Sequence, residues 1–179
     1  VTQNFETEAT LKTGRTGGLP YVGVGWYRCT FEVPEGRQAE LLFDGAMSEA
    51  VVYVNGREAC RSPYGYSPFH FDATPYLNTD GKTNTLAVRL ENRQFSSRWY
   101  PGAGLYRNVH LVTTDKVNVP VWGTHITTPH VKPGYASVHL ETEVEGGEGA
   151  ALKITTSIYA PDGKLAAVKT FAGKTGAGQ

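Results

Sequence analysis

The sequence predicts an all-β chain whose first part is a jelly-roll-type β-sandwich, and three observations lead to this fold class. Apolar and polar residues alternate with period two along most of the chain, which is the pattern of half-buried strands. No window of a dozen residues keeps the apolar stripe of an amphipathic helix. The chain also has 21 glycines and 10 prolines, many of them in turn signals that separate the alternating segments at short intervals.

Five strands are predicted in the first part of the chain. They cover residues 25–33, 39–44, 50–54, 85–91 and 107–113. In the first strand Tyr27, Cys29, Phe31 and Val33 occupy alternate positions, so their side chains share one face.

Two dipeptides, Asn55-Gly56 and Asp80-Gly81, are typical hairpin turns, because both central residues of a tight hairpin turn need a positive φ. Between them, residues 71–76 can hold one short helical turn. Asp72 would suit the cap of that turn.

The pattern resets around residues 115–120, where Pro120 interrupts the alternation. We place a domain boundary there, with a first domain over residues 1–118 and a second β-domain over residues 119–179. Four strands are expected in the second domain, over residues 126–131, 136–145, 152–159 and 165–171. Turn signals separate them at residues 132–134, 146–147 and 161–163.

Charge and apolar content exclude several kinds of partner. The 17 basic and 17 acidic residues cancel, so the chain has no electrostatic footprint for nucleic acid or an anionic membrane, and a neutral ligand such as a sugar fits better. No apolar run approaches the ~20 residues of a membrane-spanning helix. The first residues do not resemble a signal peptide, and Met47 is the only methionine, so we expect an excised or processed piece of a longer protein.

The usual catalytic and metal-binding patterns are missing. The chain has no GxSxG, GxxxxGK[ST] or HExxH motif, and the five histidines show no metal-ligand spacing, so we expect no metal and no cofactor. Cys29 and Cys60 are predicted to be free, mostly buried thiols, with a disulfide as the alternative in an oxidising compartment.

One loop, residues 98–107 (RWYPGAGLYR), combines three large aromatics with two arginines and two glycines. Aromatic and guanidinium planes can rest against a flat polar ligand such as a sugar. The alternative is a corner or domain interface that is packed for stability.

This loop and four upstream motifs occur in the order and at roughly the spacing found in the amino-terminal sugar-binding sandwich of family 2 glycoside hydrolases. The upstream motifs are residues 25–31 (GWYRCTF), 52–56 (VYVNG), 66–72 (YSPFHFD) and 84–92 (NTLAVRLEN). The chain therefore resembles a β-galactosidase or a near relative over about residues 5–110. Several motifs in register are far harder to obtain by chance than one.

The resemblance implies a galactose-binding-like jelly roll followed by an immunoglobulin-like sandwich. An immunoglobulin-like sandwich needs about 100 residues, so residues 119–179 would form only part of one. The unpaired edge and apolar face of such a part favour association of copies into a homo-oligomer. Enzymes of this kind that act on external glycans are often exported, so we expect a periplasmic or extracellular location.

The resemblance also divides the chemistry between this chain and a region outside it. The family carries its catalytic carboxylates on a (β/α)₈ barrel, for which this chain has no counterpart, so we assign no catalytic residue and expect the fragment alone to be inactive. The expected partners are a terminal β-galactoside and the catalytic barrel of the parent chain. Asn92, Arg98 and Trp99 are the candidate substrate-binding residues, while Arg28 and Arg107 are expected to pair with carboxylates. A stand-alone carbohydrate-binding module without hydrolase activity is the alternative.

Overall fold

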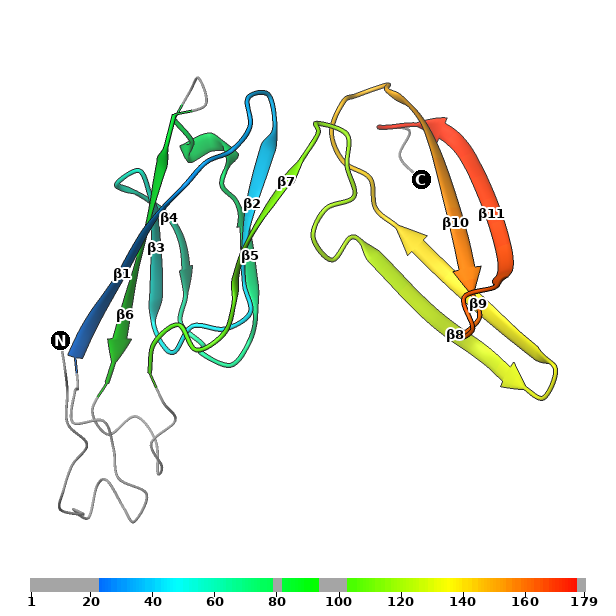
Figure 1. The fold of residues 1–179 in the computed structure, drawn as a ribbon, viewed down its shortest axis with the longest axis horizontal. Helices are drawn as coiled ribbons and strands as arrows, with labels where there is room; N and C mark the ends of the chain where they lie inside the picture. Colours follow the sequence, from blue (N-terminus) through cyan, green and yellow to red (C-terminus); the bar gives the residue numbers. More distant parts are fainter. Residues whose placement is uncertain (1–22, 79–81, 94–102, 177–179) are drawn as a thin grey trace, which may run out of the picture. The chain divides into compact units, whose positions relative to one another are not determined.

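The computed structural model describes residues 23–78, 82–93 and 103–176, and its regular structure is almost entirely β (Figure 1). The chain divides into two compact units, Val1–Thr113 and Thr114–Gln179. The domain boundary predicted from the sequence, between residues 118 and 119, lies five residues after the division between these two units. The predicted all-β fold class is confirmed.

The first unit is a sandwich of two sheets. Its larger sheet has the strand order β1-β6-β3-β4, and its smaller sheet has the order β5-β2-β7. The strands are β1 Gly23–Phe31, β2 Gln38–Phe43, β3 Ala50–Val54, β4 Arg57–Ser62, β5 Phe69–Asp72, β6 Asn84–Asn92 and β7 Val109–Thr114. All five strands predicted for this part of the chain are present, while β4 and β5 were not among the predicted ranges.

The core of the sandwich follows from the alternation of side chains along the strands. In β2 every second residue, from Ala39 to Phe43, is buried between the sheets, and the residues between them are only half-buried. Phe43 stacks on Phe69 of β5 with ring centroids 4.7 Å apart and an interplanar angle of 5°. Burying each large apolar side chain contributes roughly 1.5–3 kcal/mol, so these inward rows hold the two sheets together.

A buried asparagine network fixes the end of the sandwich at which β6 begins. Asn84 is 1% exposed, and its side-chain oxygen accepts hydrogen bonds from Asn55 Nδ2 at 2.8 Å and from the Asn78 N–H at 2.8 Å. Asn55 and Gly56 have φ values of 51° and 78°, and they turn β3 into β4 as predicted. The Asn84 amide therefore ties a hairpin turn to the segment that precedes its own strand.

The predicted helical turn is a short 3₁₀ helix, η2 (Thr74–Tyr76), but its cap differs from the prediction. Ala73 occupies the capping position. Asp72 stands one residue earlier and still accepts a hydrogen bond from the Thr74 N–H at 2.9 Å. The carboxylate thus closes a local turn before the helix, as Asx side chains commonly do.

An apolar pocket of about 350 Å³ lies between the two sheets, on the side of the edge strands β1 and β7. Cys29 lines this pocket and is exposed, so the prediction of mostly buried thiols is wrong for this residue. The reason is that β1 is an edge strand, and its inward face is only partly covered. Cys60 is half-buried, and burial raises the pKa of its thiol. Both thiols are free, as predicted.

The second unit consists of two antiparallel hairpins. One pairs β8 (Thr124–Lys132) with β9 (Tyr135–Thr142), and the other pairs β10 (Ala151–Tyr159) with β11 (Leu165–Lys174). All four predicted strands are present. Positive φ values at Gly134, Gly146 and Gly163 fall in the three predicted turns. Several apolar side chains of these hairpins are exposed, among them Val131 at 71% and Phe171 at 59%.

The described part of the chain contains no helix long and apolar enough to cross a membrane. Within the same residues, no group of three or more histidine, cysteine, aspartate or glutamate side chains is arranged to hold a metal ion.

Candidate functional site

The candidate site lies at the end of the first unit where β6 finishes. Asn92, the last residue of β6, pairs with Gly23 at the start of β1. Residues 44–49 connect β2 to β3 and lie at the same end, because β3 runs antiparallel to β6 and begins where β6 finishes. Residues 63–68 connect β4 to β5 and lie there as well, because β4 runs antiparallel to β3 and finishes where β3 begins. Residues 103–108, which lead into β7, complete the cluster. We call these segments the loop end of the sandwich.

A short segment, Met47 to Glu49, links the other parts of the loop end. The Met47 N–H donates to the Gly104 carbonyl at 3.0 Å, and the Gly104 N–H donates to the Met47 carbonyl at 2.9 Å. Ser48 exchanges two hydrogen bonds with the backbone of Glu91, one through its hydroxyl at 3.1 Å and one through its carbonyl at 2.9 Å. The peptide bond between Met47 and Ser48 is cis. This segment therefore anchors the chain on both sides of residues 94–102.

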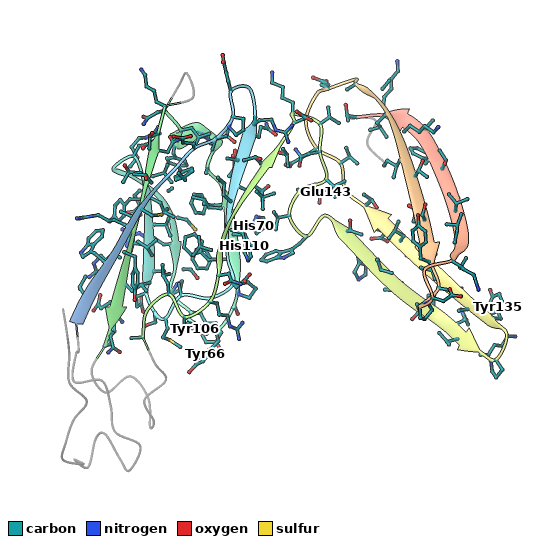
Figure 2. The ribbon with its side chains drawn as sticks, viewed as in Figure 1. Tyr66, His70, Tyr106, His110, Tyr135 and Glu143 are labelled. Atoms are coloured by element: carbon teal, nitrogen blue, oxygen red, sulfur yellow. The ribbon has the colours of Figure 1, made fainter. Side chains whose placement is uncertain are left out.

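Three tyrosines line the same end. Tyr106 donates a hydrogen bond from its hydroxyl to the Gly65 carbonyl at 2.8 Å, and Figure 2 shows Tyr106 and Tyr66 close to the end of the unit. Tyr64 and Tyr66 are exposed, with ring centroids 5.6 Å apart and ring planes at 60°. Gly65 is buried between them. A side chain there would collide with Met47, because a Cβ would lie 3.0 Å from the Met47 Cα. The aromatic pair is therefore carried by a tightly held turn.

Beside Asn92 lies a network of two arginines and two glutamates. Arg89 contacts Glu91 at 3.1 Å, and Arg93 contacts Glu91 and Glu49 at 3.3 Å each. The hydrogen bond from Arg89 is the main reason why the pKa of Glu91 lies below its ordinary value, and the charges of Arg93 and Arg89 act in the same direction. Glu91 is therefore an ionised carboxylate at neutral pH.

This charge pattern does not suit a retaining glycosidase. Such an enzyme needs one carboxyl group that stays protonated and a second that is ionised for attack. Glu49 and Glu91 do meet around Arg93, but both make ion pairs with this arginine, and the lowered pKa of Glu91 leaves its carboxylate without a proton to donate at neutral pH. Through Arg93, the two glutamates instead link the end of β6 to residues 44–49 and so stabilise the loop end.

Of the three candidate substrate-binding residues, the structure describes only Asn92. Asn92 is half-buried at the loop end, as the last residue of β6, and its role in binding a sugar stays a prediction. Arg98 and Trp99 lie outside the described residues. The glycine run 102–104 is described only from Ala103, and Gly104 has a φ of 111°, as expected for a turn at this point.

Among the described residues neither Arg28 nor Arg107 has the carboxylate partner that the sequence predicts. The Arg28 guanidinium lies over the Trp26 ring, 5.6 Å from its centroid, because both side chains project from the outer face of β1. Arg107 lies over the Tyr106 ring at 5.2 Å and donates to the backbone carbonyl of Asp44 at 3.5 Å. The Asp44 carboxylate is engaged instead by His110, at 3.0 Å.

The sequence interpretation missed Met47 to Glu49 and the Tyr64/Tyr66 turn. The first has no sequence signal, because its partners are far away in the chain. The second has one, since two tyrosines flank a glycine between Pro63 and Pro68, and aromatic residues in a proline-bounded turn are candidates for ligand contact.

The comparisons with known proteins agree with this geometry. Residues 18–115 match the family model described as "Glycosyl hydrolases family 2, sugar binding domain". The first unit thus falls in the class of sugar-binding sandwich domains of glycoside hydrolases. The chain belongs to glycoside hydrolase family 2.

Curated relatives include both galactosidases and glucuronidases. The chain is 38% identical to Beta-galactosidase BoGH2A of Bacteroides ovatus, an alignment that covers 98% of this chain and 21% of that protein. It is 33% identical to a putative beta-glucuronidase of Formosa agariphila, over 86% of this chain and 15% of that protein. The chain therefore spans about a fifth or less of the length of these relatives.

Solved structures of the family have the same fold. A beta-glycosidase from Bacteroides vulgatus superposes with a TM-score of 0.81 at 29% identity, covering 95% of this chain and 22% of that one. A beta-glucuronidase from Bacteroides uniformis has a TM-score of 0.74 at 32% identity, covering 86% of this chain and 20% of that one.

Proposed function

We propose that this chain is a non-catalytic part of a family 2 glycoside hydrolase that removes terminal β-galactosides. In this proposal the first unit positions the sugar, while the acid/base and nucleophile carboxylates come from a barrel in the parent protein. The observation that carries the proposal is the match of residues 18–115 to the family's sugar-binding domain.

The geometry of the loop end supports a positioning role. Asn92 offers one acceptor and two donors on a short side chain, which suits a pair of sugar hydroxyls. Its backbone follows Glu91, which Ser48 and two arginines hold in place. A group held in this way loses little conformational entropy on binding, so it can orient a substrate. Arg98 and Trp99 belong to the same proposal on sequence grounds alone.

β-Galactoside is our choice of substrate because the relative with 38% identity over 98% of the chain is named a beta-galactosidase. β-Glucuronide is the second candidate, since relatives named as beta-glucuronidases align at 33% and 29% identity. The two substrates differ in the configuration of the C4 hydroxyl and at C6, where the glucuronide has a carboxylate in place of a hydroxymethyl group. A glucuronidase must pair this carboxylate with a cation.

Hydrolysis of matched aryl glycosides by the parent enzyme tests this choice. We expect kcat/KM for the aryl β-galactoside to exceed that for the aryl β-glucuronide at least tenfold, and the 179-residue chain alone to hydrolyse neither. A preference for the glucuronide would replace the proposed substrate. Turnover by the chain alone would overturn the non-catalytic role.

A further inference from the structure

The outer face of the four-stranded sheet carries aromatic and arginine side chains, of which the positioning role uses only Arg89. Trp26 of β1 and Tyr53 of β3 project from this face, because their neighbours Tyr27, Val52 and Val54 point into the pocket or the core. The two rings lie side by side with centroids 5.7 Å apart and planes tilted by 35°. Trp26 is 49% exposed. We call Trp26, Arg28, Tyr53, Ala87 and Arg89 the sheet platform.

The register of the sheet sets the arrangement of the platform. Ala87 of β6 pairs with Arg28 on one side and with Tyr53 on the other. Trp26 pairs with Arg89 in the next row of the same face. Trp26 and Tyr53 come from the strands on the two sides of β6, yet their ring centroids are only 5.7 Å apart. The two rings therefore lean toward each other over β6, where the small Ala87 leaves room for them.

The polar groups around the two rings include both donors and acceptors. Arg28 lies over the Trp26 ring and makes no ion pair with any described residue, so its N–H groups can donate to a ligand. Arg89 is paired with Glu91 at 3.1 Å. On the β4 side of the face, Arg61 is paired with Glu58 at 2.6 Å. Most charges on this face are thus compensated locally, and both hydrogen-bond donors and acceptors remain at its surface.

This combination fits a neutral sugar better than it fits a protein. The central parts of protein interfaces are depleted of charged residues, whereas here arginines and glutamates surround the two rings closely. A pyranose ring presents a flat apolar face that rests on an aromatic ring, and its edge hydroxyls both donate and accept hydrogen bonds. An acidic glycan would meet carboxylates as well as arginines on this face.

We infer that the sheet platform is a second carbohydrate-binding surface, distinct from the loop end, which holds the chain of a neutral polysaccharide through stacking on Trp26 and Tyr53. It does not depend on the proposed hydrolysis of β-galactosides. Its role would be to keep the protein on a polymeric glycan.

Affinity electrophoresis of the intact protein, in gels with and without a neutral β-galactan, tests this inference. We expect the glycan to retard the wild-type protein, and Trp26→Ala to weaken the apparent affinity about tenfold, the loss expected when one stacked aromatic is removed. Trp26→Phe should keep part of the retardation, since a smaller ring remains. Tyr135→Ala is the matched control, because Tyr135 is an aromatic of the second unit with a similar exposure, 54%.

Three results would overturn the inference: no retardation of the wild-type protein by the neutral glycan, equal retardation of Trp26→Ala, or stronger retardation by polygalacturonate. The test also separates this surface from the loop end. Asn92→Ala should leave retardation unchanged, while Trp26→Ala should leave turnover of a small aryl glycoside unchanged.

Discussion

At the scale of single residues, hydrogen bonds from buried polar side chains hold the turns of the first unit in place. Asn84 is the clearest case, because its buried amide serves Asn55, Asn78 and the Lys82 carbonyl. Asn84→Ala leaves several of these groups unpaired inside the protein. Each costs about 1–3 kcal/mol, so we expect a loss of roughly 2–4 kcal/mol in the free energy of unfolding.

Urea unfolding measures that loss, and Asn108→Ala is a suitable comparison, because Asn108 is exposed. If Asn84→Ala unfolded at the same urea concentration as the wild-type protein, the buried network would contribute nothing.

The pKa of Glu91 leads to a prediction about pH. Because that pKa is lower in the folded protein than in the unfolded chain, the carboxylate contributes stability that is present above about pH 4.3, the ordinary value for glutamate. This contribution is lost as the pH falls through the lowered folded pKa. Glu91→Gln should therefore destabilise the protein at pH 7, and the difference from wild type should shrink toward pH 3.

Thermal unfolding of both proteins between pH 7 and pH 3 measures this difference. Glu35→Gln is the control, since Glu35 is exposed and makes no ion pair among the described residues. A difference between Glu91→Gln and wild type that stayed constant over this range would contradict the assigned ion pairs.

At the scale of elements, the strands that alternate most clearly could be predicted, and the others could not. β3 has the predicted bounds, because four consecutive β-forming residues, Val51 to Val54, end at an Asn-Gly turn. β4 was missed because this edge strand is mostly polar and has a register shift near Val52. β5 has only four residues and follows Pro68, so alternation gives little signal.

The same limit applies to the candidate site. Asn92 could be proposed only through the family resemblance, which implies that the loop after Leu90 reaches the sugar. The role of Met47 could not, since its partner Gly104 lies far along the chain and the contact depends on the fold.

The turn from β3 to β4 gives a prediction at this scale. Gly56 has a φ of 78° and nothing within 4 Å of where a Cβ would stand, so Gly56→Ala suffers only backbone strain. We expect a loss of about 1 kcal/mol in the free energy of unfolding. Gly25 has equal space around it without the positive φ, so Gly25→Ala should cost clearly less. Chemical denaturation of the two variants distinguishes them, and equal losses would argue against strain at the turn.

At the scale of the whole molecule, association through the second unit remains a prediction. Val131, Val168 and Phe171 are each more than half exposed. Apolar side chains exposed on hairpins favour pairing with another copy. Light scattering should show a mass that rises with concentration for the chain, and Phe171→Lys should reduce that rise. A strictly monomeric wild-type chain at high concentration would exclude this association.

The central claim is that the loop end positions the sugar in a hydrolase whose catalytic groups lie elsewhere. Its most direct test is kcat/KM of the parent enzyme for an aryl β-galactoside after Asn92→Ala, with Glu35→Ala, an exposed position at the other end of the sandwich, as the control. We predict a fall of roughly five- to thirtyfold for Asn92→Ala and wild-type thermal stability, because a lost hydroxyl contact costs about 1–2 kcal/mol in the transition state. An unchanged kcat/KM in a folded Asn92→Ala enzyme would contradict the claim.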